Sequence, residues 1–342
     1  MKESLIQAWY GGRRYWWLWL LYPLAWLYLG IVTYRRHRFL IGWRSRSPVE
    51  IPVIIVGNLT VGGTGKTPLT LHLVKLLRAA GWRPGIVSRG YGGKTSYPSQ
   101  VGPRSTAAEV GDEPLLMFRD SGAPVVVDPQ RRRGVDYLAR HALCDIVLSD
   151  DGLQHYALPR DLELVVIDAS RGLGNGRTLP LGPLREPLAR LASVDAVLIN
   201  GEPEACLPHE IPDHVPCFRF QLAPGALQPM GGQDPQGAPG LGARVHAVAG
   251  IGHPQRFFRT LECMGFQVIP HPYADHHAYV AADLDFGDDI PVIMTSKDAV
   301  KCRDFANSST WVLPVSVVTD TGFDTFIMAF LSRCRENHNH AG

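Results

Sequence analysis

The stretch that most constrains the fold is residues 51–77, IPVIIVGNLTVGGTGKTPLTLHLVKLL. Its β-branched run at residues 53–56 predicts a buried strand, and apolar residues at helical spacing predict a helix from Thr67 onward. The turn between them matches the phosphate-loop pattern G-x-x-x-x-G-K-[ST] except at the first position, where Thr60 replaces glycine. A strand, a glycine-rich turn and a helix in this order predict a site for nucleotide phosphates.

The residue types in this turn have the chemistry that phosphate binding needs. Glycines let backbone amides curve around phosphate oxygens, and the helix N-terminus adds partial positive charge. Lys66 is placed to reach the β- and γ-phosphates, and the Thr67 hydroxyl to ligate Mg²⁺. We therefore predict ATP and Mg²⁺ as cofactors, with these nucleotide-binding residues: Thr60, Val61, Gly62, Gly63, Thr64, Gly65, Lys66 and Thr67.

The N-terminal segment predicts contact with a membrane. Residues 15–34, YWWLWLLYPLAWLYLGIVTY, carry no charge over a length that is about enough to span a bilayer core. Arginines flank the segment at 13–14 and 35–38, and they suit anionic lipid head groups. Pro23 and the many tryptophans favour a helix lying in the interface, but the sequence leaves a spanning helix open. Since a phosphate loop uses cytoplasmic ATP, the rest of the chain is expected on the cytoplasmic face.

Composition limits the other possibilities. The chain of 342 residues suggests about two domains, and 45% apolar with 19% charged residues is typical of a globular protein. A net charge of +2 gives no indication of a nucleic-acid partner, and no protein partner is evident. The six cysteines form no C-x-x-C pair, which argues against a zinc site or a disulfide framework.

Strands alternating with helices predict a mostly parallel, doubly wound α/β sheet, in which ligands collect at the carboxyl ends of the strands. We predict a membrane anchor and basic connector (1–45), a phosphate-loop kinase domain (46–225) and a smaller C-terminal α/β domain (226–342). The Pro- and Gly-rich residues 203–242 are interpreted as a linker or crossover. Further predicted strands are 84–88, 124–127, 146–149, 164–167, 196–199, 245–249, 266–269 and 292–294.

A paired carboxylate follows one of these strands. Asp150 and Asp151 close the apolar run at 146–149, as in the Walker-B arrangement that holds Mg²⁺ or its water ligands. Which of the two touches the metal stays open. Gln154 and His155 lie one turn further on and are candidate substrate contacts.

Other polar groups are candidates for binding an anionic substrate or for proton transfer. Guanidinium groups suit phosphate, and the candidate substrate residues here are Arg131, Arg132, Arg185 and Glu186. His276 belongs to an Asp-His-His run that suits general-base work better than metal binding. Lys297 and Asp298 follow a strand, and helix capping explains them as well as any binding role does.

These features together predict a membrane-anchored, ATP-dependent phosphotransferase acting on a lipid. The alternative is a membrane-bound ATPase switch of the partitioning type without lipid phosphorylation activity. Such switches carry a lysine just before the paired glycines of the loop, where this chain has Val61. A GTPase is a weaker alternative, because the sequence contains no N-K-x-D guanine reader.

The sequence also resembles a known family, the bacterial tetraacyldisaccharide 4'-kinases (lipid A 4'-kinases), from the aromatic N-terminal segment to about Arg303. Threonine at the first loop position is normal in that family. Ser296 departs from it, since an acidic residue is common there. The motifs that carry the resemblance are VGNLTVGGTGKTP (56–68), SRGYGG (88–93), GDEP (111–114), DDGLQH (150–155), PLREP (183–187), AGIGHPQRFF (249–258), DHH (275–277) and TSKDAVK (295–301).

The resemblance implies transfer of the γ-phosphate of ATP to the 4'-hydroxyl of an acylated glucosamine disaccharide 1-phosphate, giving lipid IVA at the cytoplasmic face of the inner membrane. It implies Lys66 as a catalytic residue, Thr67 with Asp150 and Asp151 as the Mg²⁺ ligands, and a site between two domains. It further implies an Asp112–His276 dyad that activates the acceptor hydroxyl. The remaining positions it implies are Tyr91 near the nucleotide and Gln154, His155, Arg185 and Glu186 lining the site.

Overall fold

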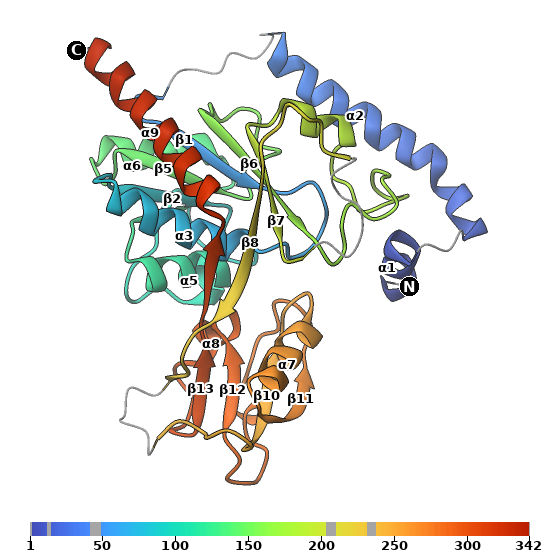
Figure 1. Cartoon of the computed structure of the whole chain (residues 1–342), viewed down its shortest axis with the longest axis vertical. Helices are drawn as coiled ribbons and strands as arrows, with labels where there is room; N and C mark the ends of the chain where they lie inside the picture. Colours follow the sequence, from blue (N-terminus) through green and yellow to red (C-terminus); the bar gives the residue numbers. More distant parts are fainter. Residues whose placement is uncertain (1, 12–14, 42–48, 203–209, 231–236, 342) are drawn as a thin grey trace.

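The chain forms two lobes joined by an extended pair of strands, seen in a computed structural model (Figure 1). The structure describes residues 2–11, 15–41, 49–202, 210–230 and 237–341. The predicted connector at 42–48 and the arginines at 13 and 14 lie outside the described residues.

The larger lobe is built on a nine-stranded sheet in the order β14-β8-β7-β6-β1-β5-β2-β4-β3. All neighbours from β8 to β4 pair in parallel, whereas the edge strands β3 and β14 pair antiparallel. The predicted doubly wound, mostly parallel fold is therefore confirmed. The strands are β1 Val53–Gly57, β2 Pro84–Ser88, β3 Ser99–Gln100, β4 Val125–Val127, β5 Ile146–Asp150, β6 Leu162–Asp168, β7 Ala196–Asn200, β8 Cys217–Pro224 and β14 Val315–Thr319.

Helices cover both faces of this sheet, which explains why its central strands are continuous apolar runs. β1 and β5 are buried at every position, as strands in parallel sheets usually are. The helices on one face are α3 Lys66–Ala79, α4 Ala107–Val110, α5 Asp112–Ser121 and α9 Thr321–Ala341. Those on the other face are α6 Arg131–Arg140 and the short helix η2 Leu188–Ser193.

The smaller lobe has a five-stranded sheet in the order β11-β10-β12-β13-β9, in which only β9 is antiparallel to its neighbour. Helix α7 covers one face through its phenylalanines and Leu261, and α8 covers the other through Ala299 and Cys302. The elements are β9 Gln228–Pro229, β10 Arg244–Ala249, α7 Pro254–Cys263, β11 Gln267–Pro272, η4 Ala281–Asp283, β12 Val292–Thr295, α8 Ser296–Cys302 and β13 Thr310–Leu313.

Two sequence expectations differ from the structure. The prediction that residues 203–242 are a linker is wrong for β8, an eight-residue strand within the larger sheet. The chain also returns from the smaller lobe, because β14 pairs with β8 and α9 packs on the larger lobe. Residues 315–341 therefore pack with the larger lobe rather than with the other residues of the predicted C-terminal domain (226–342). β14 is the edge strand and β8 lies next to it, and nearly all their residues are exposed or half-buried, so neither shows the buried apolar run that marked the central strands.

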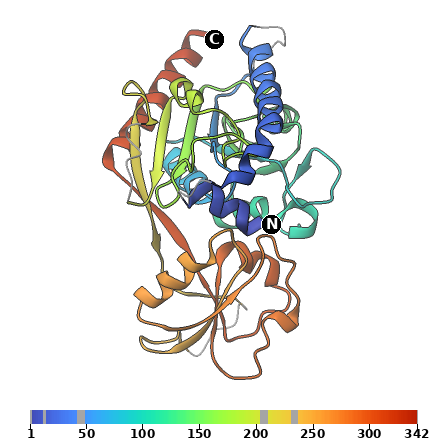
Figure 2. The ribbon, with the colours of Figure 1, turned by 90° about the vertical axis from the view of Figure 1, so that its right-hand side faces the viewer.

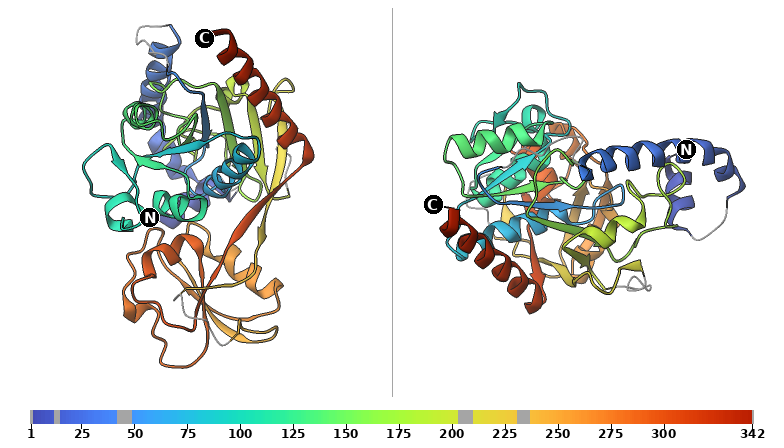
Figure 3. Two further views of the ribbon diagram at one scale, coloured as in Figure 1. Left: turned by 90° about the vertical axis from the view of Figure 1, so that its left-hand side faces the viewer. Right: turned by 90° about the horizontal axis from the view of Figure 1, so that it is seen from above.

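The N-terminal segment forms α1 Lys2–Tyr10, the short helix η1 Trp16–Leu21 and α2 Tyr22–Leu40 (Figure 2). Pro23 lies in the first turn of α2, where its missing N–H is no loss, rather than in mid-helix. Seen from above, α2 extends beside the larger lobe (Figure 3). The outer surface of η1 and α2 is apolar and exposed, with Trp19 of η1 and Trp26 of α2 each 70% accessible.

Candidate active site

The predicted phosphate loop joins β1 to α3 at the centre of the larger sheet. Gly65 immediately precedes α3 and has a left-handed backbone with φ of 94°. A Cβ at this position would lie 2.7 Å from the Asn200 side-chain nitrogen, so only glycine is accommodated. The Asn200 amide in turn donates to the Thr64 carbonyl at 3.1 Å and fixes the loop against the end of β7.

The PLREP segment braces the first half of the loop. The Val61 amide donates to the Pro183 carbonyl at 2.9 Å, and the Arg185 amide donates to Leu59 at 2.6 Å. Thr60 is buried and forms an isolated β-bridge with Leu184. Since Thr60 is not among the described residues with positive φ, nothing in its backbone requires glycine. This geometry explains the threonine at the first loop position.

The two Walker-B carboxylates have different surroundings. Asp151 has a positive φ of 49°, and its carboxylate lies 3.5 Å from Lys66 Nζ and 2.9 Å from Arg185 Nη1. Burial alone raises the pKa of Asp151, but Lys66 and Arg185 outweigh it and lower the pKa to about 2. Asp150 is 1% exposed, and its Oδ1 has no hydrogen-bond partner among the residues that the structure describes. Burial and then the charge of Glu113 raise the pKa of Asp150 well above its usual range.

The PLREP side chains divide between the site and the interior. Arg185 reaches Asp151, and Gln154 donates to the Asn58 carbonyl at 3.3 Å and to Glu186 at 2.9 Å. Glu186 is fully buried, where it also accepts from Tyr156 and lies 3.5 Å from Arg190. Glu186 therefore holds Gln154, Tyr156 and Arg190 from the protein interior. Its predicted contact with substrate stays a prediction.

The remaining predicted substrate residues are Arg131, Arg132 and His155. Arg131 is 2% exposed and donates to the backbone carbonyls of Asp128 and Asp150, so it holds the end of β5. Arg132 pairs with Asp136 of the same helix at 2.8 Å. Burial lowers the pKa of His155 to about 4, and the charge of Arg131 acts in the same direction. His155 is accordingly neutral at physiological pH.

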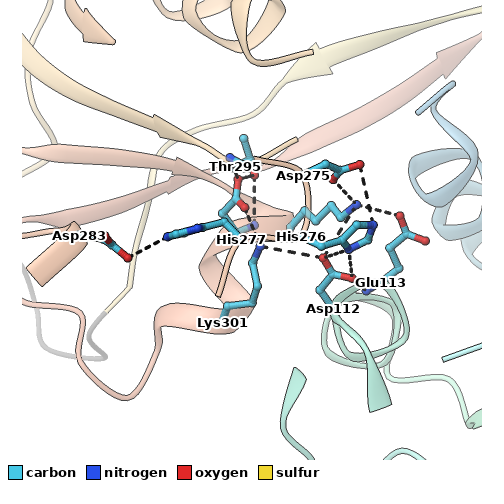
Figure 4. Close-up of polar contacts among 11 residues, drawn as sticks. Asp112, Glu113, Asp275, His276, His277, Asp283, Thr295 and Lys301 are labelled. Carbon is cyan, nitrogen blue, oxygen red and sulfur yellow. Dashed lines mark hydrogen bonds and ion pairs between the residues drawn. The ribbon is translucent and has the colours of Figure 1, made fainter. Parts of the chain in front are cut away.

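The predicted dyad is brought together across the two lobes (Figure 4). Asp112 opens α5 in the larger lobe, and its two carboxylate oxygens lie 2.9 and 3.1 Å from His276 Nδ1 in the smaller lobe. His276 has a positive φ of 62°, which turns its ring out of the loop toward Asp112. The hydrogen bond that His276 donates to the Asp112 carboxylate fixes Nδ1 as the protonated nitrogen and leaves Nε2 as the acceptor.

The surrounding charges move the pKa of each partner. Burial raises the pKa of Asp112, but the hydrogen bond from His276 and the charges of Lys297 and Lys301 outweigh it, so the pKa lies below its usual value. The hydrogen bond to Asp112 raises the pKa of His276, against burial and the charge of Lys297. The pair is therefore an orienting carboxylate with an imidazole, the arrangement that serves a general base.

Tyr91 lies on the dyad rather than on the phosphate loop. Its ring is 66% exposed, and its centre is 5.3 Å from the centre of the His276 ring. The glycine turn that carries it packs against α5, because a Cβ on Gly111 would lie 2.7 Å from the Tyr91 carbonyl. A role of Tyr91 near the nucleotide stays a prediction.

The smaller lobe also reaches over the phosphate loop. Gly252, in the turn before α7, lies so close that a Cβ there would be 3.8 Å from the Gly63 amide. Arg171, which follows β6, donates to the Gly252 carbonyl at 3.4 Å. Arg256 of α7 lies 3.7 Å from Asp168 at the end of β6. The carboxyl ends of β1, β5 and β6 therefore face the cleft between the lobes, as expected for an open α/β sheet.

Sequence reasoning assigned no role to several of these residues. Glu113 and Lys297 meet at 3.0 Å across the cleft, and Arg171 and Arg256 close its other end. The sequence could have indicated two of them, because Glu113 adjoins the predicted Asp112 and Lys297 lies within the TSKDAVK motif. Nothing in the sequence indicated Arg171 except its place shortly after a strand.

The side chains near the phosphate loop fit a Mg²⁺ site that is completed by nucleotide phosphates and water, rather than one formed by protein ligands alone. No group of three or more His, Cys, Asp or Glu side chains among the described residues is arranged to hold a metal ion. Mg²⁺ at nucleotide sites usually takes one or two protein oxygens and completes its octahedron with phosphates and water. The unpartnered, buried oxygen of Asp150 beside the loop fits that requirement.

Comparisons with known proteins agree with one another. The sequence pattern of the tetraacyldisaccharide-1-P 4'-kinase family matches residues 17–332. A tetraacyldisaccharide 4'-kinase of Alkalilimnicola ehrlichii is 53% identical over 313 residues, which are 91% of this chain and 92% of that protein. The enzyme of the same name from Ectopseudomonas mendocina is 48% identical over 334 residues, 97% of each chain.

A solved structure is similar over nearly the same length. LpxK from Aquifex aeolicus, crystallised in complex with ATP, superposes with a TM-score of 0.75 at 26% sequence identity. The similarity covers 93% of this chain and 99% of that one.

Proposed function

The chain belongs to the tetraacyldisaccharide-1-P 4'-kinase family and is an ATP-using kinase of lipid A biosynthesis, and from this premise we propose how its residues divide the reaction. The observation that carries the proposal is the contact of 2.9 Å between Asp112 and His276 across the cleft from the phosphate loop. Such a contact supports a base that acts opposite the donor. An ATPase switch that only hydrolyses nucleotide has no need of it.

The donor half is the phosphate loop with Lys66. Its lysine is held by Asp151 at 3.5 Å, and the phosphates of ATP offer it a stronger partner. Asp150, which ends β5, and Thr67, in the first turn of α3, would hold Mg²⁺. When bound, the ion neutralises charge on the transferring phosphoryl group. Arg185 stays within reach of the same phosphates through its contact with Asp151.

The acceptor half is the dyad. His276 Nε2 takes the proton of the sugar 4'-hydroxyl while the hydroxyl oxygen forms its bond to the γ-phosphorus and the bond to the ADP oxygen breaks. Asp112 holds the ring in the correct tautomer and stabilises the imidazolium that results. Because the two residues belong to different lobes, the base is complete only when the cleft is closed, and closure also keeps water from the γ-phosphate.

The lipid end of the site is proposed to lie on helix α2. The helix contacts the segment between β6 and β7 along its length: Tyr22 meets Arg177, the Tyr28 hydroxyl donates to the Arg185 carbonyl at 2.9 Å, and Arg36 donates to Ser193. These contacts extend over roughly 21 Å of helix at 1.5 Å per residue.

A helix fixed in this way cannot cross a bilayer without drawing Arg177 and Arg185 into the hydrocarbon. Its window of apolar residues is also only 6% buried within the protein. We therefore place η1 and α2 flat in the interface of the inner membrane, on the cytoplasmic face. Trp19 and Leu20 of η1 and Leu27 of α2 would then contact the acyl chains, and the arginines would contact anionic head groups.

One assay tests the division of labour. Purified protein in mixed micelles is given γ-labelled ATP, Mg²⁺ and tetraacyldisaccharide 1-phosphate, and label is followed in lipid and in inorganic phosphate. We expect label in the lipid for the parent protein, and loss of that transfer with ATP still bound for His276→Ala. Label released only as inorganic phosphate by the parent protein would favour the ATPase switch.

A second measurement tests the membrane placement. Binding to vesicles containing anionic lipid is compared for the parent chain and a variant with Trp19 and Trp26 both changed to serine. We expect the variant to bind more weakly, while protease added outside sealed vesicles still cleaves the protein on both sides of α2. Protection of one side would show that the helix spans the membrane.

A further inference from the structure

Lys297, in the first turn of α8, sits at the contact between the two lobes. Its Nζ lies 3.0 Å from Glu113, 3.2 Å from Asp275 and 3.9 Å from Asp112, and its side chain is only 18% exposed. Two of these carboxylates belong to α5 of the larger lobe, and the third adjoins His276 (Figure 4). One lysine thus faces three acids that approach from both sides of the cleft.

The neighbouring residues of the motif hold Lys297 in this position. Thr295 caps α8 by accepting from the Asp298 amide. The carboxylate of Asp298 is fully buried and accepts from the Thr295 hydroxyl at 2.7 Å and from the Gly250 amide at 2.9 Å, so the start of α8 is fixed to the turn after β10. Lys301 is the cation nearest Asp298, at 2.9 Å. Asp298 is therefore matched within its own helix, and Lys297 is directed to the acids across the cleft.

We propose that Lys297 is the positioning residue of the acceptor half: it draws the start of α5 onto the loop of the smaller lobe and so assembles the Asp112–His276 base. This rests on the proposed function of that dyad. Without Lys297, three carboxylates would face one another across a partly desolvated contact, and their repulsion would favour an open cleft. An exposed ion pair contributes little, but a lysine that is mostly buried among three acids is screened much less.

The same charge also tunes the base. The groups that face His276 are Asp112 from α5, Asp275 from its own loop, Lys297 from α8 and the ring of Tyr91. Asp112 and Asp275 raise the pKa of His276, and Lys297 lowers it. Lys297 therefore keeps more of His276 in the neutral form that accepts a proton at physiological pH.

The test compares Lys297→Met and Lys297→Arg in the full-length protein, with ATP and lipid acceptor saturating. We expect Lys297→Met to lower kcat about 10- to 100-fold, part of what a positioned base supplies, with little change in the KM for ATP. Turnover comes only from molecules in which Asp112 still meets His276. In these molecules the acid limb of kcat against pH should move to higher pH, because the charge that lowers the pKa of His276 is gone. Lys297→Arg restores the charge and should return kcat to within about 3-fold of the parent.

A matched control and a second background make the result decisive. Arg259→Met removes an exposed cation of α7, which covers the other face of the smaller sheet from α8, and should leave kcat and the pH limb unchanged. In an Asp112→Asn background, Lys297→Met should cost at most about 3-fold more, because both changes disable one unit. Circular dichroism and thermal unfolding check that every variant is folded.

Two outcomes would overturn the proposal. If Lys297→Met keeps the kcat and pH limb of the parent while Asp112→Asn and His276→Ala lose activity, the dyad stands and Lys297 does not position it. If the losses of Lys297→Met and Asp112→Asn multiply, Lys297 acts elsewhere. Unchanged activity in Asp112→Asn and His276→Ala would instead refute the proposed dyad itself.

Discussion

The donor and acceptor halves of the cleft are built in opposite ways. The phosphate loop is one contiguous strand, turn and helix, braced by backbone hydrogen bonds from PLREP and by the buried Asn200. The acceptor dyad joins residues 164 positions apart through side chains alone, and His276 remains 34% exposed. One half is fixed before any substrate arrives, and the other exists only while two lobes are in contact.

This difference suits the chemistry. A loop that must present several amides to phosphate oxygens gains from rigidity, since the amides are then oriented at no further cost. A base that must activate a lipid hydroxyl, and not water, gains from being assembled late. Substitutions in the donor half should therefore impair ATP binding and catalysis together, whereas those in the acceptor half should impair catalysis alone.

The largest effect is expected for Lys66→Ala. Removing the ammonium takes away the main positive charge on the transferring phosphoryl group, so kcat/KM for ATP should fall by about 10³-fold or more. Steady-state kinetics with saturating lipid measures this, and Lys75→Ala on the same helix serves as a control. A variant with the parent's rate would remove the phosphate loop from the mechanism.

His276→Ala should follow, with a loss of about 10²-fold in kcat. Because the phosphate loop is untouched, the Kd for ATP should match the parent in a fluorescence titration. His277→Ala is the matched control, since the neighbouring His277 bonds Asp283 within the smaller lobe. Weaker ATP binding in His276→Ala would break the separation between the two halves.

The pH dependence should show a smaller effect with a definite sign. The base works only when neutral, and its pKa is raised by Asp112, so kcat should fall as pH drops through a value above that of an ordinary histidine. Asp112→Asn removes the charge that raises this pKa and should move the acid limb down by about one pH unit, at a lower kcat. A limb that does not move would separate His276 from Asp112.

The stability of the contact between the lobes should fall as pH rises through the pKa of His276, whereas kcat should rise there. A folded-state pKa that is raised, as for His276, contributes stability that is complete below the unfolded pKa and lost as pH rises through the folded one. The lowered pKa of Asp112 adds stability that is lost as pH falls through it. The closed cleft is thus most stable between these two values, while turnover needs a pH near or above the upper one, where His276 is neutral.

Tyr28→Phe should have the smallest effect. It removes only the hydrogen bond from α2 to the Arg185 carbonyl, about 1 kcal/mol, and the donor half keeps its other braces. We expect kcat within about 3-fold of the parent and a slightly lower thermal unfolding midpoint. A large loss of kcat would mean that the rigidity of the donor half depends on the membrane helix.

Local patterns in the sequence predicted much of this molecule. The runs at β1, β2, β5 and β7 are continuous and apolar because helices cover both faces of the sheet, and the end of the run at β5 predicted the carboxylates of Asp150 and Asp151 beside the phosphate loop. Gly65 and Lys66 follow from the backbone geometry that phosphate requires. The pairing of Asp112 with His276 was predicted only through the family resemblance, since an aspartate and a histidine 164 residues apart carry no local signal of contact.

The tertiary structure decided what depends on distant pairing. Strand β14 forms the edge of the larger sheet and β8 lies next to it, and about half of the residues of these two strands are exposed. Neither strand has the continuous apolar sequence that predicts a buried strand. The approach of Lys297 to Glu113 requires that the chain cross to the smaller lobe and fold back along β14. The sequence by itself determined the strand, the loop and the apolar helix, because hydrogen bonding and backbone angles within a few residues fix them. Which acid meets which base, and that α2 lies along the β6–β7 segment, follow only from packing between segments far apart in the chain.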